Sequence, residues 1–97
     1  MSHYFKIGKL AASTGLKGEL VLQHNLGKKT TLKGLEAIFL EEKKDSFIPY
    51  FLESAKIRNH NETVIKLEGI DIVETARKLT PREVWIDEAD FQQFAAK

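Results

Sequence analysis

The sequence has 97 residues, enough for one domain with a single modest core. Its hydrophobic content of 42% and charged content of 30% are those of an ordinary globular protein, and no apolar stretch has the length that crosses a bilayer. The absence of cysteine excludes disulfides, thiol nucleophiles and cysteine-based zinc sites. Because the first residues also lack the apolar region of a secretory signal, we expect a cytoplasmic protein without membrane association.

The net charge of +1 hides an asymmetry along the chain. Residues 1–34 contain six lysines and one glutamate, a local charge of +5, whereas residues 35–97 carry −4. A basic segment suits contact with phosphate groups. On composition alone, however, solubilising surface lysines are the simpler interpretation.

The first third of the chain predicts two strands joined by an exposed turn. Period-2 alternation marks residues 4–10 and 19–24, and the turn Gly15-Leu16-Lys17-Gly18 lies between them. In the first strand, alternation places Phe5 and Ile7 on one face and Tyr4 and Leu10 on the other. The polar, lysine-rich stretch from Asn25 to Gly34 is predicted to be a loop.

The middle of the chain predicts two hairpins. Residues 35–41 and 46–53 form the first, with the turn at 42–45, and residues 55–58 and 63–68 form the second around 59–62. Pro49 cannot donate a ladder hydrogen bond, so it is expected at a sheet edge or a bulge.

The last third predicts one helix and a final strand. Asp71 is expected to cap the helix, with Glu74 reaching back to form a capping box. Ile72, Ala76 and Leu79 recur at helical spacing and would face the remaining structure, and Pro81 would end the helix. Residues 83–86 form the last strand and contain the sole tryptophan, Trp85, while residues 87–97 read as a linker or tail with room for one helical turn around Phe91 and Phe94.

Many short strands with turn signals and one short helix predict an all-β fold, a closed or nearly closed antiparallel β-barrel. Closure removes the exposed edges that a small open sheet would present. A β-sandwich is the alternative architecture.

The Gly-x-x-Gly turn has two interpretations. Its backbone amides and Lys17 could contact nucleic-acid phosphates, or the glycines could serve the geometry of the turn alone. It lies between strands, unlike the loop of a KH domain, and it lacks the spacing of a phosphate-binding P-loop. Lys28, Lys29 and Lys33 are expected on a loop next to this turn.

Other side chains give no positive sign of catalysis or metal binding. The aromatic residues Tyr50, Phe51 and Trp85 could stack bases, but core packing is the better interpretation of apolar strands. The three histidines lie far apart in sequence without metal-ligand spacing, and no nucleophile-base-acid set stands out. We therefore expect no enzyme, no metal and no cofactor.

Two groups of motifs resemble the RimM family of bacterial ribosome maturation factors. The first is Tyr4-Phe5-Lys6-Ile7-Gly8-Lys9-Leu10 with Gly15-Leu16-Lys17-Gly18-Glu19-Leu20. The second is Lys66-Leu67-Glu68-Gly69-Ile70-Asp71 followed by Glu74-Thr75-Ala76-Arg77-Lys78-Leu79, and Glu83-Val84-Trp85-Ile86 resembles the closing strand of the family's N-terminal domain. Two positions depart from the family pattern. Thr14 replaces a common histidine, and Thr80 replaces a common glycine.

The resemblance implies a six-stranded antiparallel β-barrel like those of translation-factor domains, formed by residues 1–86. Residues 87–97 would lead toward a C-terminal PRC barrel, which this sequence does not contain. The implied function is late assembly of the small ribosomal subunit head and 16S rRNA processing. The implied partners are the subunit head, ribosomal protein S-nineteen and 16S rRNA, bound by a monomer.

For this sequence we therefore predict a ribosome- or RNA-binding site. Its residues are Lys9, Thr14, Gly15, Leu16, Lys17, Gly18, Lys28 and Lys29. The alternative function is a translation-factor-like or enzyme-associated barrel that acts as a protein-interaction module without touching RNA.

Overall fold

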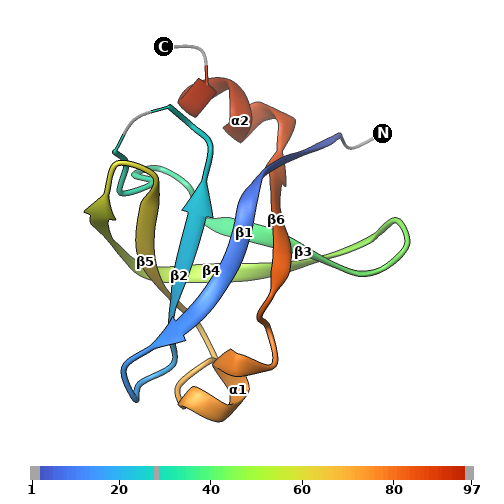
Figure 1. Ribbon diagram of the computed structural model, residues 1–97. Helices are drawn as coiled ribbons and strands as arrows, with labels where there is room; N and C mark the ends of the chain where they lie inside the picture. The colour runs from blue at the N-terminus through green and yellow to red at the C-terminus, as the bar shows by residue number, and fades with distance from the viewer. Residues whose placement is uncertain (1–2, 28, 96–97) are drawn as a thin grey trace.

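The computed structural model describes residues 3–27 and 29–95, and they form a closed six-stranded antiparallel β-barrel (Figure 1). Around the barrel the strand order is β1-β2-β5-β4-β3-β6. The strands are β1 (Tyr4–Thr14), β2 (Glu19–His24), β3 (Ala37–Lys43), β4 (Ser46–Asn59), β5 (Glu62–Leu67) and β6 (Arg82–Asp87). Helix α1 (Val73–Arg77) lies between β5 and β6, and α2 (Glu88–Ala95) follows β6. The predicted barrel is confirmed.

The core is a single cluster of aliphatic side chains inside the barrel, and segments outside the strands close its two ends. Leu32 and Leu35, from the loop after β2, are buried at the end near α2. Ala76 of α1 and Leu79 just after it are buried at the other end. The strands contribute Ile7, Leu10, Leu20, Leu22, Ile38, Leu40, Ile65, Leu67, Val84 and Ile86.

Two bulges in β1 overturn the predicted alternation of its side chains. The pairing register shifts between Lys6 and Gly8 against β6, and between Leu10 and Ala12 against β2. Ile7 and Leu10 are consequently both fully buried, whereas Phe5 faces outward. A bulge adds one residue to a strand and thereby reverses which residues face inward beyond it.

Strand β4 joins two segments that were predicted to be separate strands. It runs without interruption from Ser46 to Asn59, pairing first with β3 and then, from Leu52 onward, with β5. Pro49 pairs with Phe39 on one side, and no β5 residue is paired with it on the other. Pro49 therefore occupies a stretch of the barrel wall that behaves as an edge, as expected for a residue without an N–H.

The start of α1 differs from its predicted form. The N-cap position is Ile72, and no side-chain hydrogen bond caps the helix, so the predicted Asp71–Glu74 capping box is wrong. The Asp71 carboxylate instead accepts a hydrogen bond from Lys66 Nζ. Ile72 is 53% exposed rather than buried, whereas Ala76 and Leu79 are buried as predicted.

Residues after the barrel fold back onto it as α2. The Phe91 ring lies 4.7 Å from the Phe5 ring, between centroids, so α2 packs beside the start of β1. No helix among the described residues is long and apolar enough to cross a membrane.

Aromatic residues pack mainly on the outer face of the barrel. Trp85 lies in an outer cluster, with its ring centroid 5.3 Å from that of Phe47. Phe47 in turn stacks on Tyr4 at 4.5 Å, and Tyr4 contacts Phe39 at 4.8 Å. The predicted core position is therefore wrong for Trp85, and also for Phe51, which is exposed on β4. It is confirmed for Tyr50, which packs against the core.

His24 is a buried polar residue at the end of β2, where the following loop covers the barrel. Its side chain is only 4% exposed, and Nδ1 accepts a hydrogen bond from the Leu26 amide at 3.3 Å. Nε2 has no hydrogen-bond partner among the described residues. Burial, aided by the charge of His60, lowers the pKa of His24 from its ordinary value of 6.5.

We expect acid to destabilise this protein through His24. Because the pKa of His24 is lower in the folded state, the unfolded chain binds the proton more readily. The contribution of neutral His24 to the free energy of unfolding is therefore complete above a pH of about 6.5 and is lost as the pH falls through the folded-state pKa. Chemical denaturation between about pH 7 and pH 5 should show a steeper loss of unfolding free energy for the wild type than for His24→Gln. His3→Gln, at an exposed histidine, is the control and should keep the wild-type slope. Equal slopes for all three proteins would contradict this role of His24.

Candidate functional site

The turn Gly15–Gly18 joins β1 to β2 and projects from one end of the barrel (Figure 1). Gly15 and Gly18 adopt φ values of 71° and 86°, which L residues rarely adopt, so both glycines are required by the turn. Between them Leu16 is 82% exposed and Lys17 is exposed. Lys17 forms no ion pair with a carboxylate in the described part of the chain. The turn thus holds one apolar and one cationic side chain in solvent.

The same turn packs against the segment between β5 and α1. A Cβ atom at Gly18 would collide with the carbonyl group of Ile70, so the two backbones touch at this position. Ile70 is itself buried in the core cluster. The Gly-x-x-Gly turn and the Glu68-Gly69-Ile70-Asp71 turn, far apart in sequence, therefore form one structural unit.

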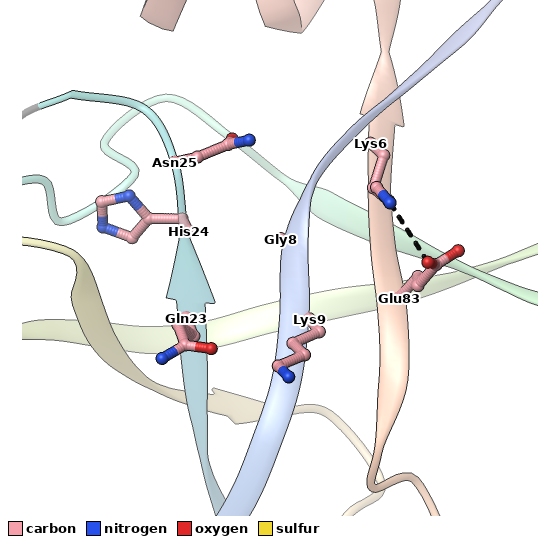
Figure 2. A pocket seen from close by; sticks show the side chains of 7 residues that line it. All are labelled: Lys6, Gly8, Lys9, Gln23, His24, Asn25 and Glu83. Carbon is pink, nitrogen blue, oxygen red and sulfur yellow. Dashed lines mark hydrogen bonds and ion pairs between the residues drawn. The ribbon is translucent and has the colours of Figure 1, made fainter.

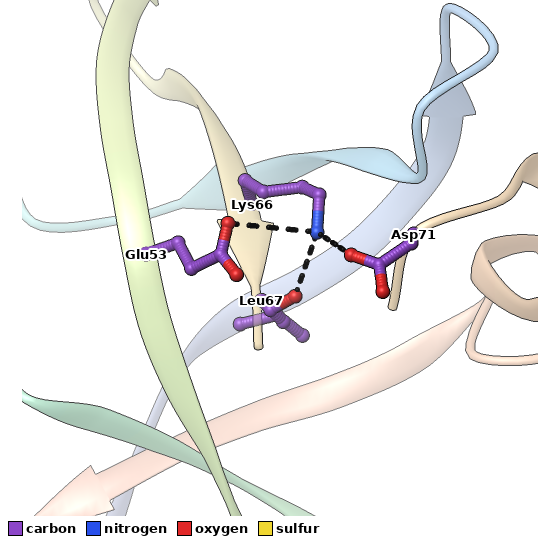
Figure 3. Close-up of polar contacts among 4 residues, drawn as sticks. All are labelled: Glu53, Lys66, Leu67 and Asp71. Atoms are coloured by element: carbon purple, nitrogen blue, oxygen red, sulfur yellow. Dashed lines mark hydrogen bonds and ion pairs between the residues drawn. The ribbon is translucent and has the colours of Figure 1, made fainter. Parts of the chain in front are cut away.

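Lys66 fixes the second of these turns to the barrel wall (Figure 3). Its Nζ donates to Asp71 Oδ1 at 2.8 Å and to the Leu67 carbonyl at 3.0 Å, and it lies 3.7 Å from Glu53 Oε1. The hydrogen bond to Asp71 is the main cause of a raised pKa for Lys66, whose side chain is only 13% exposed. A lysine side chain that is held by two strands and a turn restrains the segment that Gly18 contacts.

Helix α1 adds further side chains at this end of the barrel. It contacts β1 and β2, and its last turn carries Arg77, followed by Lys78, both exposed. We define the tip surface as Leu16, Lys17, Ile72, Arg77 and Lys78. Sequence patterns missed the last three. Ile72 was expected to be buried, and no local pattern placed Arg77 and Lys78 at the same end of the barrel as the turn.

The lysines of the loop after β2 are not part of the tip surface. Lys29 follows the end of β2 that lies away from the turn, because β2 carries the chain away from it (Figure 1), and Lys33 lines a pocket with Glu53 and Ala55 of β4; both lysines are exposed. The prediction that this loop lies next to the turn is therefore wrong. Lys28 lies outside the described residues.

Lys9 lies between the two ends, in a pocket of about 260 Å³ on the outer face of β1, β2 and β6 (Figure 2). Lys6 lines the same pocket and donates to Glu83 Oε2 at 3.1 Å, so its charge is paired. Lys9 forms no ion pair with any described carboxylate. The His24 ring points away from Lys9, and the pocket therefore holds no histidine-based catalytic pair.

The predicted site is thus divided. Thr14 ends β1 directly before the turn, so Thr14, Gly15, Leu16, Lys17 and Gly18 are brought together as predicted. Lys9 and Lys29 lie elsewhere. Across residues 3–27 and 29–95, no three histidine or acidic side chains are placed to hold a metal ion.

A rigid barrel that exposes an apolar and several cationic side chains on braced turns has the features of a small binding domain. The sequence model of the protein family described as the RimM N-terminal domain matches residues 5–91, and this chain belongs to that family.

Relatives and one solved structure agree with this assignment. The chain is 32% identical over 92 residues to the ribosome maturation factor RimM of Parabacteroides distasonis, covering 89% of this chain and 51% of the relative. It is 33% identical over 82 residues to that of Phocaeicola vulgatus, covering 84% and 46%. It therefore spans about half the length of these relatives. The fold also matches the crystal structure of a RimM from Pseudomonas aeruginosa described as a 16S ribosomal RNA processing protein, with a TM-score of 0.71 at 22% identity, covering 90% of this chain and 52% of that one.

The contact between the two turns can be tested by comparing alanine at the two glycines. Gly15→Ala adds a side chain in open space, where only Glu19 Oε1 lies near at 3.7 Å, so it should cost about 1–2 kcal/mol from the positive φ alone. Gly18→Ala has the same φ penalty and also collides with Ile70, which should add a further ~1–3 kcal/mol. Urea denaturation measures both. Equal losses would show that the two turns are not tightly packed.

Proposed function

We propose that this chain is the N-terminal, ribosome-binding part of a maturation factor that assists late assembly of the small ribosomal subunit head and 16S rRNA processing. Family membership supports the pathway, because the matched relatives are named ribosome maturation factors. In this proposal residues 1–86 are the binding barrel, and residues 87–97 connect it to a C-terminal PRC barrel. The protein acts in the cytoplasm as a monomer.

The tip surface is the proposed contact with rRNA. The observation that carries the proposal is that Leu16 and Lys17 are exposed on a turn that is braced by its packing on Ile70. Lys17, Arg77 and Lys78 would meet phosphates, and the glycines allow the backbone to approach closely. Such contacts position a domain on RNA without reading its sequence.

The proposed mechanism is binding rather than covalent chemistry. A domain that binds one arrangement of the immature subunit head better than the others shifts the folding equilibrium toward that arrangement. Ribosomal protein S-nineteen is the proposed protein partner in the head, bound chiefly through the proposed C-terminal PRC barrel.

The alternative is a protein-interaction module that makes no RNA contact. The mixed character of the tip surface favours it, because Leu16 and Ile72 are the most exposed of the large apolar side chains in the described residues. Salt dependence separates the two functions, since phosphate contacts release counterions and protein contacts of apolar side chains do not.

Charge reversal at the tip tests the proposal. Lys17→Glu should weaken co-sedimentation with immature small subunits by roughly tenfold at low salt, about 1.4 kcal/mol. It should also reduce the slope of log affinity against log salt by about 1, the effect of one lost phosphate contact.

Lys44→Glu is the matched control, because Lys44 is an exposed lysine in the β3–β4 turn, away from the tip surface. It should bind like the wild type. Wild-type affinity that does not change with salt would overturn the RNA contact in favour of the protein-interaction module. Equal weakening by both substitutions would show a general charge effect rather than a site.

A further inference from the structure

A second surface lies where β3, β4, β6 and the start of α2 meet. It is a groove of about 490 Å³, and the larger apolar residues that line it are Phe39, Pro49 and Phe51. These residues face outward because Ile38 and Leu40, which alternate with Phe39 along β3, fill the core. Phe51 is 49% exposed, so an aromatic ring is presented to solvent on the wall of the barrel.

Acidic residues also line this groove. They are Glu36, Asp87 and Asp90, and no lysine, arginine or histidine among the described residues lines it. None of the three carboxylates forms an ion pair within residues 3–27 and 29–95. Burial, reinforced by the charges of Asp87 and Glu36, raises the pKa of Asp90. The negative charge of the groove is therefore left uncompensated by the barrel itself.

We infer that this groove binds an arginine-containing extended segment of a protein partner. A guanidinium group fits both parts of the surface, since its planar face stacks on aromatic rings and its N–H groups bind carboxylates in pairs. Phe51 offers the free ring, and Asp90 and Glu36 offer carboxylates beside it. A nucleic acid is disfavoured here, because its phosphates would meet three carboxylates.

The groove and the tip surface are separate sites. The groove includes Asp87 and Asp90 at the β6–α2 junction, whereas the tip surface lies at the end of the barrel that α1 closes (Figure 1). Binding to the groove therefore does not depend on the proposed RNA contact, and its test needs no ribosome.

The experiment is an NMR titration of the isotope-labelled chain with the peptide acetyl-Gly-Arg-Gly-Arg-Gly-amide. We expect saturable shifts of the amides of Glu36, Phe51 and Asp90. The same peptide with citrulline in place of arginine keeps the side-chain shape without the charge, and it should bind at least roughly tenfold more weakly. The double variant Glu36→Gln/Asp90→Asn should weaken the arginine peptide at least about fivefold.

The matched control is Glu68→Gln/Glu74→Gln, which removes the same charge from exposed residues at the other end of the barrel. It should bind the peptide like the wild type. Equal weakening by the two double variants, or shifts centred outside the groove, would overturn the inference. Groove shifts that follow protein concentration without peptide would also overturn it, by identifying a second copy of the chain as the occupant.

Discussion

Barrel closure depends on β1, the strand that pairs with β2 along one side and with β6 along the other. A single regular strand cannot follow both partners around so small a barrel, and its two bulges supply the necessary bend. Gly8 lies between them, where the β2 backbone at Gln23 leaves no room for a side chain. This close approach turns both Ile7 and Leu10 into the core and leaves Lys6 and Lys9 outside. The outward position of Lys6 and Lys9 is thus a consequence of how the barrel closes.

The sequence predicted those parts of the fold that local chemistry determines. Strand β2 was predicted with its observed bounds, because Leu20 and Leu22 recur at a spacing of two and glycine precedes the strand, although Val21 between them is buried as well. Bulges were not predictable, because they arise from pairing with distant strands and leave the alternation of residue types unchanged. The capping box failed for a related reason. Asp71 has the side chain of a good cap, but its carboxylate accepts a hydrogen bond from Lys66 Nζ, five residues earlier, and Ile72 takes the N-cap position.

The candidate site was predicted in part. The turn Gly15–Gly18 could be recognised because glycines at this spacing between strands have few other uses. Its contact with Ile70 could not, because it joins segments about fifty residues apart that only the barrel brings together. The prediction that Lys29 lies next to the turn Gly15–Gly18 failed for a different reason. A loop that follows the second strand of a hairpin must emerge at the end opposite the hairpin turn, so antiparallel topology alone would have separated Lys29 from Lys17.

The antiparallel topology also decides where the charged side chains lie on the surface of the barrel. Their arrangement in space differs from the division of the sequence into a basic first third and an acidic remainder. The lysines of residues 1–34 that the structure describes do not form one patch, because Lys6 and Lys9 lie on the outer wall, Lys17 on the turn after β1, and Lys29 and Lys33 on the loop after β2. The strongest local asymmetry is instead between the tip surface, where Lys17, Arg77 and Lys78 are exposed, and the groove of Glu36, Asp87 and Asp90. Opposite charges on separate surfaces of a rigid barrel allow two partners of opposite charge to bind at once without competing. If both proposed contacts exist, a domain with this arrangement would hold an RNA segment and a protein segment at a fixed distance from each other. Such a fixed distance is what a factor that acts by binding alone requires, because only a rigid pair of contacts can favour one relative arrangement of its partners over the others.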